Sequence, residues 1–191
     1  MASASQRRRE LLLRAGISFR VAKADVEEVF PPGRVVEEAV VSLARAKAGA
    51  VEKRFPEDWI LAADTVVVLG ETPLQKPVDR TEAAAMLKRL SGRSHEVFTG
   101  YCLRNRARNR TLTGVARTIV VMKSLSLEEI EAYVRTGEPL DKAGAYGIQG
   151  IGAMFITQIY GSYTNVVGLP LAEVVTLLMR EGIAFPLGGQ A

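Results

Sequence analysis

The chain has 191 residues, of which 48% are hydrophobic and 24% charged, so it can form one substantial core or two small lobes that share a cleft. No stretch approaches the roughly 18 uninterrupted apolar residues of a membrane-spanning helix, and only three leucines follow the basic residues near the start. We therefore expect a cytoplasmic protein with no export signal and no membrane partner. The net charge of +4 favours an anionic partner, either nucleic acid or a small phosphate.

Apolar periodicity, capping residues and turn residues predict helices that alternate with strands along the chain. In chain order, the predicted elements are a helix at 8–15, a helix at 35–53, a strand at 60–69, a helix at 79–90, strands at 94–104 and 111–123, a helix at 126–135, a glycine-rich loop at 143–152, a strand at 153–160, a helix at 170–182 and a short strand at 183–185. The strands at 94–104 and 111–123 are expected to pair antiparallel. We therefore predict a mixed α/β fold, with residues 1–191 forming a single domain of two lobes.

Cysteine and histidine each occur once, which limits metal and redox chemistry. A single Cys102 excludes an intramolecular disulfide and a multi-cysteine zinc site, and its neighbours Tyr101 and Leu103 indicate a packed strand position. A single His95 excludes multi-histidine metal sites, and no GxSxG motif supports a Ser-His-Asp triad.

Four arginines alternate between positions 104 and 110, where the two neighbouring strands are joined. Such a stretch is typical of a solvated hairpin tip. The alternative is a nucleic-acid surface, but no aromatic residues for base stacking accompany the arginines.

The strand at 60–69 carries one carboxylate, Asp64, in the middle of an apolar run. Because an ionised Asp is costly to bury alone, we expect a metal, a cationic side chain or the mouth of a cleft to meet it. This makes Asp64 the candidate chemical centre. The alternative is an Asp that caps a turn at the edge of the sheet.

Three further polar clusters suit phosphate or metal. Ser3, Arg7 and Arg8 lie at the start of the first helix, where backbone N–H groups favour anions, although a serine there can also simply cap the helix. Glu27 or Glu28 could join Asp64 as a ligand for Mg²⁺ or Mn²⁺, although loop glutamates are usually only solvated.

Lys76 could hold a phosphate as a point charge. Lys142 precedes a glycine-rich loop in which Gln149 offers both a donor and an acceptor for a base edge. The alternative for Gln149 is a hydrogen bond with its own backbone.

These segments, in this order, resemble the Maf family of nucleoside triphosphate pyrophosphatases over nearly the whole chain. The matching segments are Ser3-Ala4-Ser5-Gln6-Arg7-Arg8, Ala44-Arg45-Ala46-Lys47-Ala48, Ala63-Asp64-Thr65, Lys76-Pro77, Leu90-Ser91-Gly92, Phe98-Thr99-Gly100, the run from Asp141 to Gly150, and Gly161-Ser162-Tyr163 through Pro170. The resemblance implies a fold of the inosine-triphosphate-pyrophosphatase type, elongated, with a central cleft between two lobes, and a homodimer. It also implies hydrolysis of a nucleoside triphosphate to the monophosphate and pyrophosphate.

The resemblance also assigns roles to individual residues. Asp64 matches the family's proton acceptor, and Arg7, Thr65 and Gln149 match positions linked to substrate choice, in the pattern of the branch that acts on dTTP and UTP. The other matching polar positions of the family cleft are Glu28, Lys47, Lys76 and Lys142. A divalent metal, Mg²⁺ or Mn²⁺, is expected at Asp64 and Glu28.

Two departures from the family pattern lie at the N-terminus. Gln6 stands where family members usually have proline, and only Met1 and Ala2 precede Ser3, where the family has a hydrophobic first strand. Either the start lies upstream or this edge of the sheet is shortened, which would loosen the turn that presents Ser3 and Arg7. The rival hypothesis is a non-catalytic nucleic-acid or septum-associated binding protein; a second rival is hydrolysis directed at modified nucleotides.

Overall fold

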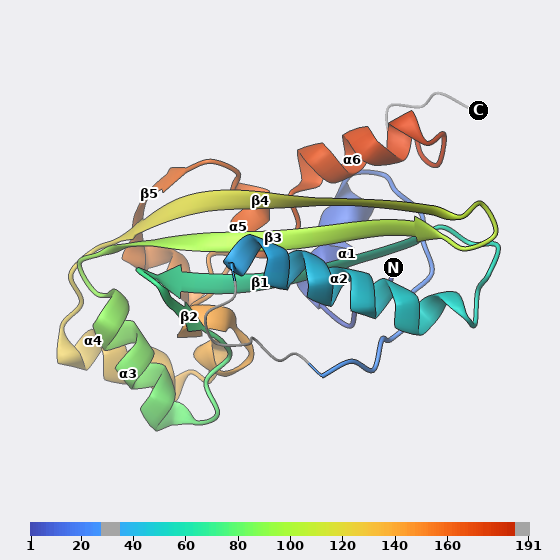
Figure 1. The fold of residues 1–191 in the computed structure, drawn as a ribbon. Coiled ribbons are helices and arrows are strands. Elements are labelled where there is room, and N and C mark those ends of the chain that lie inside the picture. The colour runs from blue at the N-terminus through green and yellow to red at the C-terminus, as the bar shows by residue number, and fades with distance from the viewer. Residues whose placement is uncertain (28–34, 186–191) are drawn as a thin grey trace. The chain divides into compact units, whose positions relative to one another are not determined.

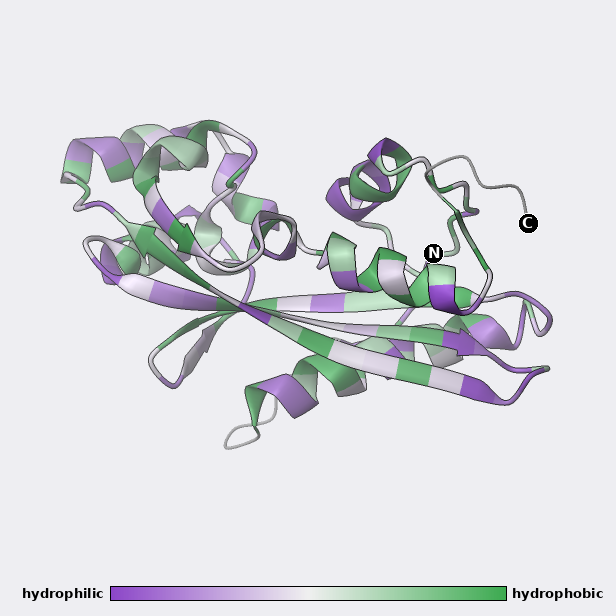
Figure 2. Ribbon diagram, turned by 90° about the horizontal axis from the view of Figure 1, so that it is seen from above, coloured by the Kyte–Doolittle hydropathy of each residue, from purple (hydrophilic) through white to green (hydrophobic). Residues whose placement is uncertain are grey.

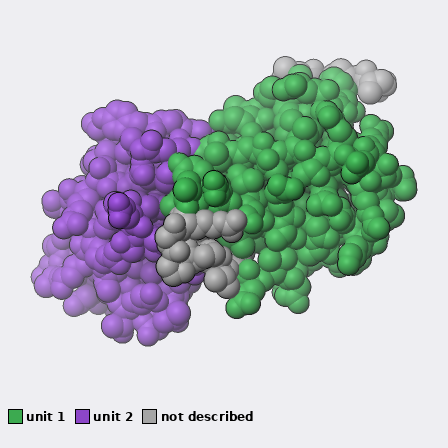
Figure 3. All heavy atoms as spheres, viewed as in Figure 1, with its two compact units in different colours: residues 1–64, 99–116, 168–191 green, residues 65–98, 117–167 purple. Residues whose placement is uncertain are grey.

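The computed structural model describes residues 1–27 and 35–185, and the chain divides into two compact units. Unit 1 comprises residues 1–64, 99–116 and 168–191, and unit 2 comprises residues 65–98 and 117–167 (Figure 3). No helix among the described residues is long and apolar enough to cross a membrane.

The secondary structure is a mixture of helices and strands, as predicted (Figure 1). The helices are α1 (Gln6–Arg14), α2 (Val36–Glu52), α3 (Arg80–Leu90), α4 (Leu127–Arg135), α5 (Tyr163–Val167) and α6 (Leu171–Arg180), with short 3-10 turns η1 (Glu138–Asp141), η2 (Ala143–Ala145) and η3 (Ile151–Phe155). The strands are β1 (Ile60–Leu69), β2 (Thr72–Leu74), β3 (Ser94–Asn105), β4 (Arg110–Met122) and β5 (Ile156–Tyr160). They form one sheet in the order β2-β1-β3-β4-β5.

Several boundaries follow directly from capping residues and hydrophobic runs. The Asp79 carboxylate accepts from the N–H of Glu82 at the start of α3, and Ser126 and Glu129 form a reciprocal capping box at the start of α4. β1 covers the predicted strand at 60–69, and β3 and β4 are neighbours that run in opposite directions (Figure 1). The long strands change between hydrophilic and hydrophobic residues along their length (Figure 2), as half-buried strands do.

In unit 1, α2 lies against β3 at Gly100. A Cβ atom at Gly100 would lie 2.4 Å from the backbone carbon of Val40 and 2.5 Å from the nitrogen of Val41. Glycine therefore allows the helix backbone to approach the strand closely, which explains the glycine of the Phe98-Thr99-Gly100 segment in terms of packing.

Met1 and Ala2 are held by backbone hydrogen bonds in unit 1, although they belong to none of its strands. The N–H of Ala2 donates to the carbonyl of Leu61 on β1 (2.7 Å), the Met1 ammonium donates to the carbonyl of Arg20 (2.7 Å), and the N–H of Ala22 donates to the carbonyl of Met1 (3.0 Å). These two residues thus bridge β1 and the extended segment around residues 20–22. The turn that follows them is held in place rather than loosened.

In unit 2, α3 packs against α4, and two edge-to-face aromatic pairs lie in the core. The ring centroids of Tyr133 and Phe155 are 5.0 Å apart, and those of His95 and Tyr146 are 5.3 Å apart. β2 pairs antiparallel with the end of β1 in a short hairpin, and β2 was not among the predicted strands.

Two strand predictions near the C-terminus are wrong in part or in full. The strand predicted at 153–160 begins only at Ile156, because the N–H of Ala153 donates back to Gly150 within η3. The strand predicted at 183–185 is absent, because the N–H of Ile183 donates to Leu178 and that of Gly182 to Met179. This bonding pattern closes the end of α6, with Gly182 in the left-handed conformation.

Candidate active site

Asp64 is met by a cation inside unit 1. Its Oδ1 lies 2.5 Å from the Nζ of Lys47, which α2 presents to β1, and the two residues are only 4% and 7% exposed. One of the expected partners of Asp64, a cationic side chain, is therefore present. A buried acid and base held this close compensate each other's charge away from bulk water.

The N-terminal cluster forms a second polar group in unit 1. The Arg8 side chain is buried and donates from Nε to the carbonyl of Gly168 (2.6 Å) and from Nη1 to the Ser3 hydroxyl (3.3 Å). Ser3 also accepts from the N–H of Ser5, and Ser5 caps α1 by accepting from the N–H of Arg8. The serine that caps the helix is therefore Ser5, whereas the Ser3 hydroxyl binds the Arg8 side chain.

The neighbouring positions of this cluster are more accessible. Arg7 is half-buried on the first turn of α1. Gln6 opens α1 and donates to Glu10. Proline is well tolerated at such a first helical position, so the departure from the family at Gln6 is compatible with the same helix start.

Only one of the two predicted metal ligands, Asp64, lies within the described residues. Glu28 lies outside the described residues, and Glu27 is exposed. Within residues 1–27 and 35–185, no three His, Cys, Asp or Glu side chains gather closely enough to hold a metal ion. Mg²⁺ commonly uses one or two carboxylates together with substrate phosphates and waters. Asp64 is a carboxylate of the type that such a shared site uses.

The remaining predicted residues belong to unit 2. Thr65 is half-buried on β1, and Lys76 is exposed after β2. Lys142 is oriented by two neighbours, since its Nζ donates to the carbonyl of Glu138 (2.7 Å) and to Oδ1 of Asp141 (2.6 Å). The sequence therefore located two groups of polar residues, Ser3, Arg7, Arg8, Lys47 and Asp64 in unit 1 and Thr65, Lys76, Lys142 and Gln149 in unit 2.

Gln149 lies at the tip of a tight turn. The N–H of Gly150 donates to the carbonyl of Gly147 (3.3 Å), so Ile148 and Gln149 are the two central residues. Ile148 is buried and Gln149 is exposed, which leaves the amide of Gln149 directed away from the core of unit 2.

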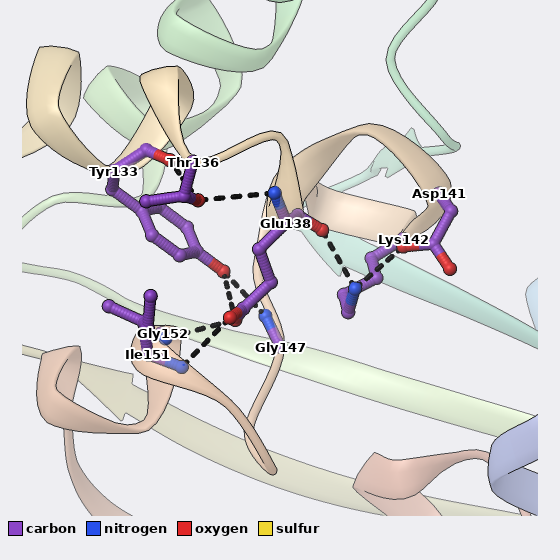
Figure 4. Close-up of polar contacts among 8 residues, drawn as sticks. All are labelled: Tyr133, Thr136, Glu138, Asp141, Lys142, Gly147, Ile151 and Gly152. Carbon is purple, nitrogen blue, oxygen red and sulfur yellow. Dashed lines mark hydrogen bonds and ion pairs between the residues drawn. The ribbon is translucent and has the colours of Figure 1, made fainter.

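Glu138 and Tyr133 hold this loop through hydrogen bonds (Figure 4). Neither residue was predicted from the sequence. The Glu138 carboxylate accepts from the Tyr133 hydroxyl (2.8 Å) and from the N–H groups of Ile151 (2.9 Å) and Gly152 (3.1 Å). Burial acts to raise the pKa of Glu138, but these hydrogen bonds from Gly152, Ile151 and Tyr133 hold the pKa below its usual range. In the sequence, the spacing of the glycines indicated a loop. It did not indicate that Glu138 and Tyr133 contact this loop.

The single histidine and the single cysteine are structural. Burial lowers the pKa of His95 to about 4, and its Nε2 lies 2.7 Å from the Tyr146 hydroxyl, so the ring is neutral at pH 7. Cys102 is fully buried on β3, and burial raises the pKa of its thiol to about 11. Neither residue has the properties of a nucleophile or a general base.

A cavity of about 640 Å³ also lies in unit 1. Its lining includes Met1, Phe19, Phe55, Trp59 and Ile183, and none of the predicted site residues. This cavity lies around Met1 and is lined by apolar residues together with charged ones such as Arg20 and Asp58. Lys47 and Asp64 are not among its lining residues.

A family model for Maf-like proteins matches residues 1–181, which is nearly the whole chain. The chain belongs to the Maf family. Similar proteins include one from Myxococcus xanthus, 51% identical over 97% of this chain and 93% of the relative, and one from Geobacter sulfurreducens, 50% identical over 95% of each. A third, from Koribacter versatilis, is 46% identical over 96% of this chain and 94% of the relative. All three carry the name dTTP/UTP pyrophosphatase.

Proposed function

We propose that this Maf protein hydrolyses dTTP and UTP to the nucleoside monophosphate and pyrophosphate. The observation that carries the proposal is the buried pair of Asp64 and Lys47, because a carboxylate held in a fixed position can orient a water molecule or accept its proton. The names of the relatives with 46 to 51% identity support the choice of dTTP and UTP. Water attacks the α-phosphorus, the bond to the bridging oxygen breaks, and pyrophosphate leaves.

In this proposal, different residues compensate charge, hold the site in place and activate the water. Arg7, Lys76 and Lys142 offset the charge of the triphosphate, and Arg8, anchored on Gly168, keeps the Ser3 turn in place. Asp64 orients the attacking water or accepts its proton. Lys47 keeps the Asp64 carboxylate fixed and balanced in charge.

We further propose that Asp64 and Glu28 hold Mg²⁺ or Mn²⁺ together with the substrate phosphates. The bound ion would supply charge compensation on the triphosphate. A carboxylate that ligates a metal cannot easily also act as a free base, so the two roles of Asp64 are alternatives. Modified pyrimidine triphosphates are the further substrate class to examine.

The rival hypothesis of nucleic-acid binding has less support, because most of the arginines at the β3–β4 turn have partners within unit 1. Arg104 pairs with Glu52, Arg110 pairs with Glu181, and the Arg108 guanidinium lies over the Trp59 ring. An elongated shape, a cleft between two lobes and a homodimer remain predictions from the resemblance, and a cytoplasmic location remains a prediction from the hydropathy of the sequence.

The test is release of pyrophosphate from dTTP, UTP, CTP, 7-methyl-GTP and modified pyrimidine triphosphates, with Mg²⁺ or Mn²⁺ added. We expect dTTP and UTP to be turned over fastest, and Asp64→Asn to lower kcat by about 10² to 10⁴. Asp58→Asn, which changes an exposed aspartate paired with Arg20, is the matched control and should retain activity. Full turnover by Asp64→Asn, or salt-sensitive DNA binding without hydrolysis, would contradict the proposal.

A further inference from the structure

The Glu138 carboxylate fastens one end of the loop that carries Gln149. Its Oε1 accepts from the N–H of Gly152 and its Oε2 accepts from the N–H of Ile151, at 3.1 and 2.9 Å. Hydrogen bonds to an ionised acceptor are stronger than neutral ones. Two consecutive backbone groups are thus fixed directly after the turn at Gly147 to Gly150.

Tyr133 fastens the other end of the same loop. Its hydroxyl donates to Glu138 and accepts from the N–H of Gly147 at 3.0 Å (Figure 4). The Tyr133 ring is itself buried and packs edge-to-face on Phe155. The turn is therefore anchored on both sides to one acid and one phenol, which α4 and η1 hold in unit 2.

Glycines at three loop positions permit this arrangement. A Cβ atom at Gly150 would lie 2.4 Å from Oε2 of Glu138, and one at Gly152 would lie 2.5 Å from the Tyr133 hydroxyl. A Cβ atom at Gly147 would lie 2.7 Å from Cε of Lys142 and 2.9 Å from Oε1 of Glu138. At these three glycines the loop backbone therefore lies close against protein side chains.

We propose that Glu138 is a positioning residue that holds the turn carrying Gln149 in place and thereby supports the preference for uracil and thymine over cytosine. The proposal rests on the proposed function. Uracil and thymine present a carbonyl acceptor at the ring position where cytosine presents an amino donor. A glutamine amide offers both a donor and an acceptor, and the distance and angle at which either can meet this ring position depend on the backbone that carries the side chain.

The experiment compares Glu138→Gln with Glu131→Gln, a matched change on the exposed face of α4, where the acid lies 4.0 Å from Arg135 and has 70% of its side chain exposed. Hydrogen exchange at Ile151 and Gly152 measures the anchoring, and the ratio of kcat/KM for UTP and CTP measures the base preference. For Glu138→Gln we expect faster exchange at both amides and a ratio that falls about tenfold, consistent with the loss of hydrogen bonds to a charged group. The change should appear mainly in KM, with Glu131→Gln close to the original protein.

Each outcome decides the proposal. Unchanged exchange at Ile151 and Gly152 would overturn the anchoring, and faster exchange with an unchanged UTP/CTP ratio would overturn the role in base choice. Tyr133→Phe, which removes only the hydroxyl, should also lower the UTP/CTP ratio. It provides the test if Glu138→Gln does not fold. Absence of any UTP hydrolysis by the original protein would contradict the proposed function and the base-choice role, whereas exchange would still report on the anchoring.

Discussion

Lys47 and Asp64 form a buried ion pair between α2 and β1, with Nζ 2.5 Å from Oδ1. Removal of one partner from such a pair leaves the other charge buried without compensation. The pair therefore couples the stability of unit 1 to the candidate chemistry of the same unit.

Lys47→Met should lower the free energy of unfolding by about 3 to 5 kcal/mol, because it leaves the Asp64 carboxylate buried without this cation. Urea unfolding measures the change. The double variant Lys47→Met/Asp64→Asn should recover part of the loss. Lys123→Met, at a solvent-accessible pair with Glu129, is the control and should cost much less stability. Equal losses for Lys47→Met and Lys123→Met would contradict the prediction.

Acidification from pH 7 to pH 5 should destabilise the protein through His95. Its folded pKa of about 4 lies below the usual 6.5, so the unfolded state binds more protons throughout this window and stability falls as the pH falls. The slope should approach about 1.4 kcal/mol per pH unit. No described residue bonds Nδ1 of His95, so a proton there would be unpaired. Urea midpoints at pH 7, 6 and 5 test this; His95→Gln should flatten the dependence, and an unchanged slope would be evidence against it.

Two glycines of unit 1 should respond to alanine in opposite ways. Gly100→Ala should cost about 1 to 3 kcal/mol, because the new Cβ would overlap the backbone of α2. Gly49→Ala lies on α2 with its nearest neighbour, Nη1 of Arg104, at 4.0 Å, and should stabilise the helix by about 0.5 to 1 kcal/mol. Thermal unfolding of both variants is the measurement, and a destabilised Gly49→Ala would show that this part of α2 is packed more tightly than the structure describes.

Cys102 should resist thiol reagents in the folded protein. Its side chain is fully buried and its thiol is protonated at pH 8, because burial raises its pKa to about 11. Labelling with a coloured disulfide reagent should be slow in buffer and fast in urea. Rapid labelling of the folded protein would contradict the burial of β3 at this position.

The regular elements were predictable because their signals are local. The β-branched run of β1, the hydrophobic periodicity of α2 and the capping residues Asp79 and Ser126 act within a few neighbouring residues. The error at 183–185 also has a local cause, because an apolar residue after a glycine suits both a short strand and the end of a helix. Only the hydrogen bond from Ile183 to Leu178 distinguishes them.

The candidate site was predictable in its residue types and less so in its contacts. The cost of burying Asp64 required a partner, but the sequence alone did not select Lys47, which is 17 residues away on another element. Glu138 gave no signal of its own, since an acid after a helix is usually solvated. Its role depends on two backbone amides 13 and 14 residues further along the chain.

The unique residues of this chain are divided between the units: Trp59 and Cys102 lie in unit 1 and His95 lies in unit 2. Tryptophan fluorescence and thiol labelling will therefore follow unit 1, while the proton resonances of one imidazole ring will follow unit 2. Residues native to the chain thus allow each unit to be observed without any substitution. Coincident transitions from these signals would demonstrate that the two units unfold together.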